Sequence, residues 1–398
     1  MRYTFLLLLL NVYAVAQLPT GNWHASIVLN DTLELPFTFS SDSNSLTIHN
    51  GDENIIVDEI SFKGDSVFIQ MPVFDSEFRC ILKENSLSGI FFNHARKNDN
   101  VFSFHADRGL SYRFSDRPER TSINITGKYH VVFDGEDVES KDAVGVFKLE
   151  GNRLTATFLT TTGDYRFLEG EIAGNRIWLS AFDGSHLFLF TALIRGDSLL
   201  NGEFFSGKHW HDTWNGIRDE NAHLVNPDSL TTLRKGPLKI NFKFPDENGK
   251  IISLSDKKYK NKAVIIQIMG SWCPNCMDET KFLVDWYRQN KKNKNRIEII
   301  ALDFEKIADT THAFRNIRRL KKQFGVTYSV LFAGPSDKKE AAKSLPMLNR
   351  IFAYPTLLFL NKEKKVIKTH TGFNGPATGE EFYKFIKYFE QTTKEINN

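Results

Sequence analysis

The pattern of hydrophobic residues changes near residue 226, and this change limits the possible folds more than any other feature. From about Gly21 to Glu220 the sequence shows many short strands with frequent turns and almost no helical periodicity. After the turn-forming residues Asn226-Pro227-Asp228-Ser229 and Gly236-Pro237, strands alternate with amphipathic helical stretches. We therefore predict two folded domains after a short N-terminal segment. The predicted divisions are a signal peptide at 1–16, an all-β domain at 17–225, a linker at 226–236 and an α/β domain at 237–398.

Short apolar runs in the first domain are separated by turn signals such as Gly163-Asp164, Gly174-Asn175 and Asp183-Gly184. This spacing is typical of an antiparallel meander. The typical predicted strands are Phe158–Thr160, Arg166–Leu168, Arg176–Ser180 and Leu187–Leu189.

The same domain contains a weak internal repeat. Three segments of its first half resemble three segments of its second half, and the spacing between them changes by a few residues, as insertions in loops would produce. We predict a duplicated antiparallel domain, built as a sandwich or as two barrel-like lobes. The matching pairs are Gly21-Asn22-Trp23-His24 with Gly127-Lys128-Tyr129-His130, Gly64 to Asp75 with Gly174 to Asp183, and Leu87 to Phe92 with Leu200 to Phe205.

The second domain has the pattern of an α/β fold. The run Ala263 to Met269 is continuously apolar, as expected for a strand covered on both faces. The elements that follow form a β-α-β unit, a β-β hairpin and a closing helix. They are predicted as a helix at 274–290, a strand at 297–302, a helix at 312–323, strands at 328–332, 356–360 and 365–368, and a helix at 379–390.

Cysteine usage points to one motif. The chain has only Cys80, Cys273 and Cys276, far too few for a scaffold built on disulfides. Two of them lie three positions apart in Gly270-Ser271-Trp272-Cys273-Pro274-Asn275-Cys276, where the apolar strand meets the predicted helix. A CxxC motif in that context is a strong signal of redox chemistry.

The position of the motif assigns a role to each cysteine. Cys273 would face the unpaired N–H groups and the positive end of the helix dipole, which stabilise a thiolate and lower the pKa of the thiol. We therefore expect Cys273 to be the nucleophile. Cys276, nearly one turn later on the same face, can attack a mixed disulfide and release the substrate.

Metal binding and a static bridge are the alternatives for this pair. Zinc would need two more ligands, and Cys80 or the histidines of His209-Trp210-His211-Asp212 could supply them only from the other domain. We interpret those histidines as a polar strand edge, with a metal site as the alternative. Cys80 is expected to be a buried free thiol, with a redox partner as the alternative. We expect no metal and no cofactor.

The C-terminal part of the chain resembles the thioredoxin superfamily, and within it the secreted TlpA/ResA-like thiol-disulfide reductases. The resemblance rests on Trp272 before the first cysteine, on Pro355 before a strand and on the front segment Phe242 to Leu254. It implies a thioredoxin-like domain, extended at its front and between its second and third strands. The complete fold would then combine an all-β N-terminal domain with this α/β domain.

The resemblance also implies a substrate groove. In the family the proline that corresponds to Pro355 is cis, so the Tyr354-Pro355 bond would be cis and would lie against the dithiol, where its backbone could pair with an extended substrate. A trans proline that merely opens a strand is the alternative. The implied substrate-binding residues are Trp272, Tyr354, Pro355 and Thr356, with Phe373 as a wall of the groove or as part of a plain connector.

Proton transfer should differ from that of thioredoxin. The buried aspartate of thioredoxin, six positions before the first cysteine, corresponds here to Gln267, and an amide cannot take a proton. ResA-like members resemble this chain in having a glutamate three positions after the second cysteine, here Glu279. We expect Glu279 to be the general base for Cys276, or else an acid favoured by the helix dipole. Glu305, at the C-terminal end of a strand where such sheets place sites, is interpreted as a surface residue, with a role in the site as the alternative.

The first residues predict export. Arg2 precedes the apolar run Phe5 to Leu10, and Ala14-Val15-Ala16 offers a cleavage site before Gln17. The alternative, a membrane anchor, would need about 20 apolar residues. Because no cysteine follows the run, we expect a periplasmic protein that is not lipidated. A net charge of +3 gives no field that would attract nucleic acid.

Together these features predict an exported thiol-disulfide oxidoreductase that reduces disulfide-bonded exported proteins. The resemblance implies a membrane thiol relay as its electron donor. In the main alternative, the β domain is a binding module that recruits a protein or glycan partner, and the redox site is accessory. An oxidase or isomerase direction also stays open. A thiol peroxidase is disfavoured because the Pro and Thr pattern around a lone nucleophile is absent.

Overall fold

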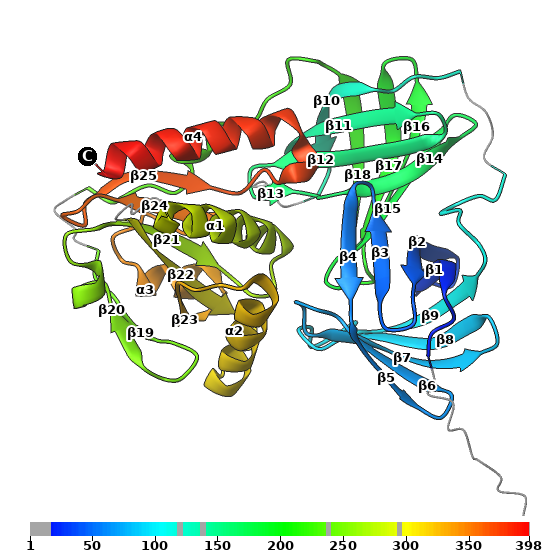
Figure 1. Cartoon of the computed structure of the whole chain (residues 1–398). Coiled ribbons are helices and arrows are strands. Elements are labelled where there is room, and N and C mark those ends of the chain that lie inside the picture. Colours follow the sequence, from blue (N-terminus) through cyan, green and yellow to red (C-terminus); the bar gives the residue numbers. More distant parts are fainter. Residues whose placement is uncertain (1–16, 118–121, 136–140, 236–239, 293–296, 398) are drawn as a thin grey trace, which may run out of the picture.

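The computed structural model describes residues 17–117, 122–135, 141–235, 240–292 and 297–397. These residues form two β lobes and one α/β domain, which packs against the lobes (Figure 1). The predicted signal peptide lies outside the described residues. The domain boundaries at 225 and 236 stay predictions. Among the described helices, none combines the length and the apolar character needed to cross a bilayer.

The first lobe is a nine-stranded antiparallel sheet in which sequence neighbours pair, apart from β4 and β5. The first strand, β1, pairs with both β2 and the last strand, β9. The sheet ends at β4 and β5, so the lobe is an opened barrel. Its strands are β1 (Gly21–Asn30), β2 (Leu33–Ser41), β3 (Leu46–Asn50), β4 (Glu53–Val57), β5 (Glu59–Lys63), β6 (Ser66–Gln70), β7 (Ser76–Lys83), β8 (Ser86–Asn93) and β9 (Val101–Arg108).

The second lobe repeats this plan but closes. Its strand β10 pairs with β11 and β18, and β11 also pairs with β12, so the sheet has no gap like that of the first lobe. Aromatic rings fill its interior, for example Phe190 and Phe204 with centroids 4.2 Å apart. The strands are β10 (Gly127–Phe133), β11 (Asp142–Glu150), β12 (Arg153–Thr160), β13 (Gly163–Asp164), β14 (Leu168–Ala173), β15 (Arg176–Phe182), β16 (Leu187–Arg195), β17 (Ser198–Ser206) and β18 (Trp210–Arg218).

The predicted duplication is confirmed, in its barrel-like form. The three repeated segments fall on equivalent strands, namely β1 and β10, β6 and β15, and β8 and β17. The two lobes also share a core, because Phe182 of β15 packs against Phe37 and Phe91 of the first lobe, with ring centroids 4.7 and 5.0 Å away. Each lobe is therefore stabilised partly by the other.

One predicted strand is wrong. Arg166–Leu168 is not a strand, because β14 begins only at Leu168 and Arg166 has a left-handed backbone with a φ of 57°. This conformation is unfavourable for a residue with a side chain. The Arg166 guanidinium lies among buried carboxylates, and these contacts offset the local cost.

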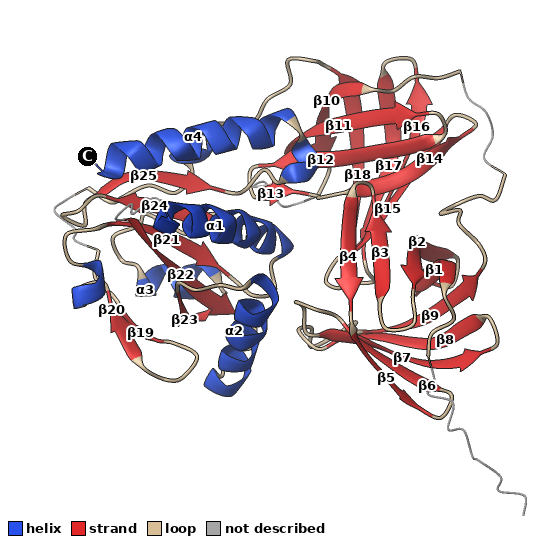
Figure 2. Ribbon diagram, in the orientation of Figure 1, coloured by secondary structure: helices blue, strands red, loops and turns tan. Residues whose placement is uncertain are grey.

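The α/β domain contains a five-stranded sheet in the order β23-β22-β21-β24-β25. The strand β21 runs parallel to β22 and antiparallel to β24, which confirms the thioredoxin-like topology. The short helix α3 was not predicted (Figure 2). The elements are β19 (Lys243–Pro245), β20 (Ile251–Ser253), β21 (Ala263–Met269), α1 (Pro274–Lys292), β22 (Ile297–Glu305), α2 (Thr310–Phe324), β23 (Ser329–Pro335), α3 (Lys338–Ser344), β24 (Thr356–Leu360), β25 (Val366–Thr371) and α4 (Glu380–Asn397).

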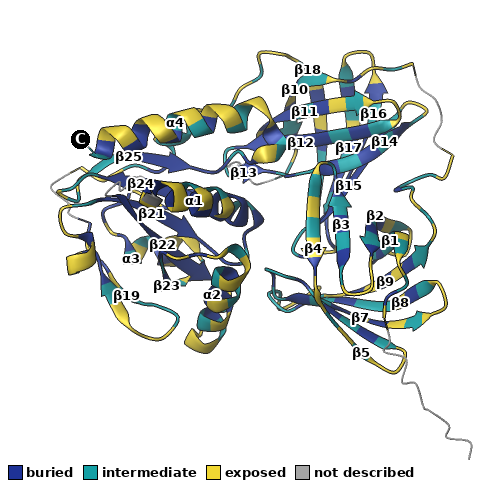
Figure 3. Ribbon diagram, in the orientation of Figure 1, coloured by how far each residue is buried: buried dark blue, intermediate teal, exposed yellow. Residues whose placement is uncertain are grey.

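Burial differs between the two kinds of sheet (Figure 3). Along β1 buried and partly exposed residues alternate, because one face of the lobe's sheet is turned toward its core. All residues of β21 are buried, as its apolar sequence predicted. This central strand therefore gives the site at its C-terminal end a rigid support.

Candidate active site

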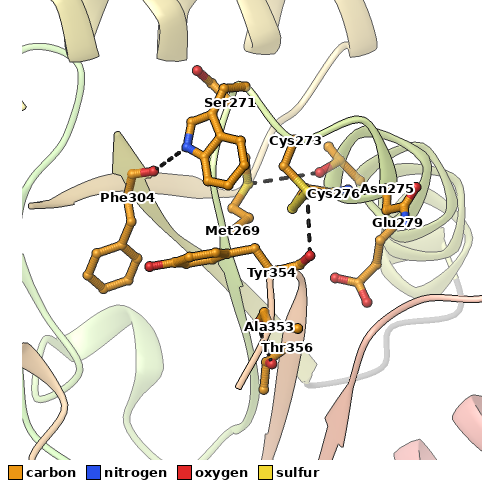
Figure 4. The surroundings of a disulfide bond; sticks show 12 residues. Met269, Ser271, Cys273, Asn275, Cys276, Glu279, Phe304, Ala353, Tyr354 and Thr356 are labelled. Atoms are coloured by element: carbon orange, nitrogen blue, oxygen red, sulfur yellow. Dashed lines mark hydrogen bonds between the residues drawn. A yellow bond between two sulfur atoms is a disulfide. The ribbon is translucent and has the colours of Figure 1, made fainter. Parts of the chain in front are cut away.

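The CxxC motif lies where β21 ends and α1 begins (Figure 4). Cys273 and Cys276 form a disulfide with their Cα atoms 5.2 Å apart. Cys276 is fully buried, whereas Cys273 keeps 6% of its surface exposed. The backbone N–H of Cys276 points at Cys273 Sγ, with N 3.2 Å from the sulfur. In the reduced protein this N–H and the helix dipole favour a thiolate at Cys273.

The loop before β24 lies against the same sulfur. The carbonyl oxygen of Tyr354 is 3.6 Å from Cys273 Sγ (Figure 4), and the Tyr354–Pro355 peptide bond is cis, as the resemblance implied. The Tyr354 ring meets Trp272 edge-on, with centroids 5.6 Å apart. Trp272, Tyr354 and Pro355 are thus gathered around the dithiol.

Two other predicted substrate-binding residues are placed differently. Thr356 is fully buried, and its hydroxyl donates to the Ala353 carbonyl at 2.8 Å. Phe373 is also buried and packs against Phe385, with centroids 5.0 Å apart. Neither side chain lines the cavity beside Cys273; Tyr354 and Pro355 do not line it either, and only the Tyr354 carbonyl reaches the sulfur. Both side chains support the site from its buried side, and their contact with substrate stays a prediction.

The end of β22 holds the loop that precedes Cys273. The Ser271 N–H donates to Asp303 Oδ1 at 2.9 Å, and the Trp272 indole donates to the Phe304 carbonyl at 2.9 Å. Ser271 Oγ also donates to Glu305. Burial, together with the charge of Glu305, raises the pKa of Asp303 well above its usual value. Asp303 therefore holds its proton more tightly than an ordinary aspartate does.

The prediction that Glu305 is a surface residue is wrong. Its exposed fraction is 2%, because the carboxylate turns inward to accept from Ser271 and, at 3.4 Å, from the Asn316 amide. Sequence analysis also missed Asp303. A carboxylate within an otherwise apolar strand was the available signal, since such a group needs a partner once it is buried.

Glu279 lies on α1 one turn after Cys276 (Figure 4). It is fully buried, and Gln267 donates to its Oε2 at 3.0 Å. Its Oε1 has no hydrogen-bond partner among the described residues. Burial raises the pKa of Glu279 to about 8, although the Gln267 hydrogen bond opposes this shift. The group is therefore protonated at neutral pH and exchanges its proton near pH 8.

The second β lobe contacts the CxxC motif directly. The Asn275 amide donates to the Asp164 carbonyl at 3.0 Å, and Ser185 Oγ donates to the Trp272 carbonyl at 3.4 Å. The Asp164 carboxylate accepts from the Gly375 N–H at 2.6 Å. Burial raises the pKa of Asp164 to about 7, against the effect of this hydrogen bond. Residues of the lobe thus reach both the CxxC motif and the loop after β25.

A buried ion cluster joins the three bodies. Arg166 of the second lobe pairs with Asp183 at 2.8 Å and with Asp278 of α1 at 2.9 Å. It also pairs with Glu53 of the first lobe. All four side chains are at most 10% exposed. The sequence does not reveal this cluster because its members come from distant parts of the chain.

A cavity of about 370 Å³ lies beside the dithiol, between the β lobes and the α/β domain. This volume is in the range of small-ligand sites. Its walls include Trp272, Cys273 and Asn275 on one side and residues of both lobes on the other. The β domain therefore forms part of the redox site, which disfavours an independent binding module with an accessory redox site. The lobe residues on its wall include Arg96, His209 and Trp210.

The remaining candidate residues have ordinary partners. Within the described ranges, no three His, Cys, Asp or Glu side chains gather as a metal ion would require. His211 pairs with Glu203, and His209 accepts from Arg96.

Cys80 is confirmed as a buried free thiol, and burial raises its pKa to about 12. That thiol is therefore unreactive in the folded protein.

Comparison with known proteins agrees with this geometry. Residues 237–369 match the AhpC/TSA family. The thiol-disulfide oxidoreductase ResA of Bacillus subtilis is 28% identical over 167 residues, which are 42% of this chain and 82% of that protein. ResA of Halalkalibacterium halodurans is 27% identical over 159 residues, 39% of this chain and 78% of that protein.

Two solved structures are similar to part of this chain. A putative thiol:disulfide interchange protein DsbE from Chlorobium tepidum has 19% identity and a TM-score of 0.31, over 41% of this chain and 99% of that one. A thiol-disulfide oxidoreductase from Bacteroides fragilis has 21% identity and a TM-score of 0.28, over 37% of this chain and 98% of that one. From the sequence matches and the site geometry, the C-terminal part of the chain is an AhpC/TSA-type, thioredoxin-like thiol-disulfide oxidoreductase domain with ResA homologues and the CxxC pair Cys273–Cys276.

Proposed function

We propose that the chain is an exported disulfide reductase for disulfide-bonded exported proteins. The observation that carries the proposal is the position of Cys273 Sγ. It lies at the start of α1, 3.2 Å from the Cys276 nitrogen and 3.6 Å from the Tyr354 carbonyl of the cis-proline loop, and Cys273 also lines the interdomain cavity. The apolar run and small-residue pattern of residues 1–16 support export to the periplasm.

The reaction takes two steps. The Cys273 thiolate attacks one sulfur of the substrate disulfide, so that a mixed disulfide forms and the other substrate sulfur leaves as a thiolate. The Cys276 thiolate then attacks Cys273 Sγ, which releases the second substrate thiolate and forms the Cys273–Cys276 disulfide. The substrate gains two electrons that the dithiol loses. Another dithiol must then re-reduce the pair, and the family resemblance favours a membrane thiol relay as this donor.

Glu279 would serve the second step. Its carboxylate, formed near pH 8, can take the proton of the Cys276 thiol. Gln267 holds this carboxyl group in place and cannot itself accept a proton. Trp272, Tyr354 and Pro355 would contact the substrate, whereas Thr356 and Phe373 would hold the groove from behind.

The direction of electron flow is tested by the reduction potential of the pair. The full chain is equilibrated with thiol redox buffers and the reduced fraction is measured by alkylation. A reductase requires a value near that of thioredoxin, about −270 mV, whereas an oxidant such as DsbA lies near −120 mV. A potential above about −180 mV, the value of protein disulfide isomerase, would overturn the reductase assignment.

The roles of the two cysteines are tested by trapping. Prereduced Cys276→Ser mixed with disulfide-intact insulin should accumulate a mixed disulfide between Cys273 and one insulin chain, while the other insulin sulfur leaves as a thiolate, because the resolving thiol is missing. The matched variant Cys273→Ser should trap nothing. Equal trapping by both variants would contradict the assigned nucleophile.

Export is tested separately by N-terminal sequencing of protein from the periplasm of a Gram-negative host, where Gln17 is expected as the first residue.

A further inference from the structure

One end of the interdomain cavity carries two cations from different domains. Arg96 lies in the loop between β8 and β9 of the first lobe, and Lys306 directly follows β22 of the α/β domain. In the described part of the chain, neither has a carboxylate oxygen within the 4.0 Å of an ion pair. Two cations at one site without an anionic partner favour the binding of an anion.

His209 adds a neutral donor to this group. The Arg96 guanidinium donates to His209 Nδ1. Because a guanidinium can only donate, Nδ1 must accept, and the proton of the neutral ring is then on Nε2. Burial and the charges of Arg96 and Lys306 lower the pKa of His209 to about 4, so the ring is neutral at physiological pH. Its Nε2–H can donate to a bound ligand.

Lys306 brings the positive charge close to the nucleophile. Its ammonium group lies 4.4 Å from the centroid of the Trp272 ring, and Trp272 directly precedes Cys273. Loss of hydration and the nearby Arg96 lower the pKa of Lys306 to about 8. A bound anion would relieve this repulsion between the two cations.

The acidic groups near the cations do not neutralise them. Asp99 and Glu305 attract Arg96 and Lys306 only from beyond ion-pair distance. Glu305 is already engaged by Ser271 and Asn316. Asp212, also on the cavity wall, accepts from the Thr213 N–H at 2.7 Å. A site for a further negative group therefore remains.

The size of the cavity limits what can reach the sulfur. Cys273 is only 6% exposed, and the β lobes form the opposite wall of a cavity of about 370 Å³. The lobes therefore restrict how closely a bulky folded protein can bring a surface disulfide to Cys273. A disulfide within a few residues of peptide fits this space.

We propose that Arg96, His209 and Lys306 form a carboxylate subsite, and that short peptide disulfides with an acidic residue next to the cysteine are the preferred substrates. This inference rests on the proposed reductase function and names its substrate class. The carboxylate binds over Trp272 while the adjacent substrate sulfur meets Cys273. The thiolate attack and the release of two peptide thiols then follow the two steps given above.

The test compares two probes that differ only in charge. They are the symmetric disulfides of acetyl-Glu-Cys-amide and of acetyl-Gln-Cys-amide. The prereduced full chain is mixed with each probe in single-turnover experiments, and peptide thiol release is quantified by mass spectrometry. The second-order rate constant should be about tenfold higher for the Glu probe, because charge-assisted hydrogen bonds are the stronger ones. Added salt should reduce this ratio.

Variants then show which side chains cause the preference for the Glu probe. Arg96→Gln should lower the Glu-to-Gln rate ratio to about threefold, and the double variant Arg96→Gln/Lys306→Gln should bring it to about one. Arg96 does not touch Trp272 in any described contact, so its variant avoids disturbing the ring under Lys306. Lys208→Gln is the matched control, because Lys208 lies over Phe102 at 5.0 Å and does not line the cavity. It should keep the full ratio.

The outcomes separate the inference from the function on which it rests. If the wild-type chain reduces both probes at equal rates, or if Lys208→Gln lowers the ratio as much as Arg96→Gln does, the carboxylate subsite is wrong while the reductase stands. If folded insulin is reduced faster than the Glu probe, the proposed substrate class is wrong. If the prereduced chain releases thiol from neither probe nor from insulin, the reductase function itself fails.

Discussion

The two faces of α1 place neighbouring carboxyl groups in opposite surroundings. Asp278, on the face toward the β lobes, is 8% exposed and pairs with Arg166 and Lys281. Glu279, on the face toward the sheet, is fully buried beside the neutral Gln267 amide. A buried carboxylate beside a cation keeps its charge and can fasten domains, whereas one without a cation tends to hold a proton. The outward face, toward the β lobes, thus helps to hold the domains together, and the inward face, toward the sheet, carries the carboxyl group proposed to accept the Cys276 proton.

Replacing Arg166, the cation that pairs with the outward face of α1, should have the largest effect on stability. Arg166→Met leaves the carboxylates of Glu53, Asp183 and Asp278 buried without their main partner. We expect the free energy of unfolding to fall by about 3–5 kcal/mol, measured by urea denaturation. Arg153→Met is the control, because Arg153 is 39% exposed and its ion pairs should contribute less than about 1 kcal/mol. An equal loss of stability in both variants would show that the buried cluster does not hold the domains together.

Removing the proton carrier of the inward face should slow the second step. Glu279→Gln cannot take the Cys276 proton, so release of the second substrate thiol should slow by about a hundredfold. In the wild type this rate should rise with pH through about 8, where the carboxylate forms, and this rise should vanish in the variant. Glu298→Gln, another buried glutamate of the same domain, should leave both unchanged. An unaltered pH profile in Glu279→Gln would rule out this base.

The same residue predicts a pH dependence of stability. The pKa of Glu279 is raised from 4.5 to about 8, so between these values the folded state binds more protons than the unfolded state. Stability contributed by this group is therefore lost as the pH rises through this window. Relative to Glu279→Gln, the wild type should become less stable from pH 5 to pH 8 in urea titrations. A constant difference between the two proteins would show that the carboxyl group is not protonated in the fold.

A single neutral contact of the outward face should contribute least. Asn275→Ala removes the hydrogen bond to the Asp164 carbonyl and should cost about 1 kcal/mol in urea denaturation. Asn221→Ala, on an exposed turn, should change stability by less than about 0.5 kcal/mol. If Asn275→Ala lowers the free energy of unfolding as much as Arg166→Met does, the CxxC motif, rather than the ion cluster, holds the domains together.

Local patterns were sufficient to predict the inward face. The apolar run of β21, the CxxC motif and the helix after it are neighbours in sequence, so the strand, the helix and the two cysteines could be placed together. Glu279 followed from its spacing to Cys276 and from a family resemblance. Its burial and its contact with Gln267 depend on how α1 packs on the sheet, and spacing alone does not contain that information.

The outward face could not be predicted, because its partners are distant in sequence. Arg166 and Asp278 are 112 positions apart and belong to different domains. Residues 166–168 have the composition of a strand, and only the buried carboxylates explain the left-handed backbone of Arg166. The prediction for Glu305 failed because its burial depends on how Ser271 and Asn316, from two other elements, pack around the end of β22. Repeats in the β domain revealed the duplication but not which lobe closes, because closure depends on β12 pairing with both β11 and β14, whereas β4 and β5 of the first lobe do not pair with each other.

The start of α1 should make Cys273 a reactive thiolate, and the alkylation rate of Cys273 as a function of pH measures this reactivity. Reduced Cys276→Ser protein is treated with iodoacetamide, and the modification of Cys273 is followed by mass spectrometry. We expect a midpoint below pH 7.5, since thiols at helix N-termini have pKa values of about 3.5–7.5. A midpoint at about 8.5, the value of an ordinary cysteine, would contradict it.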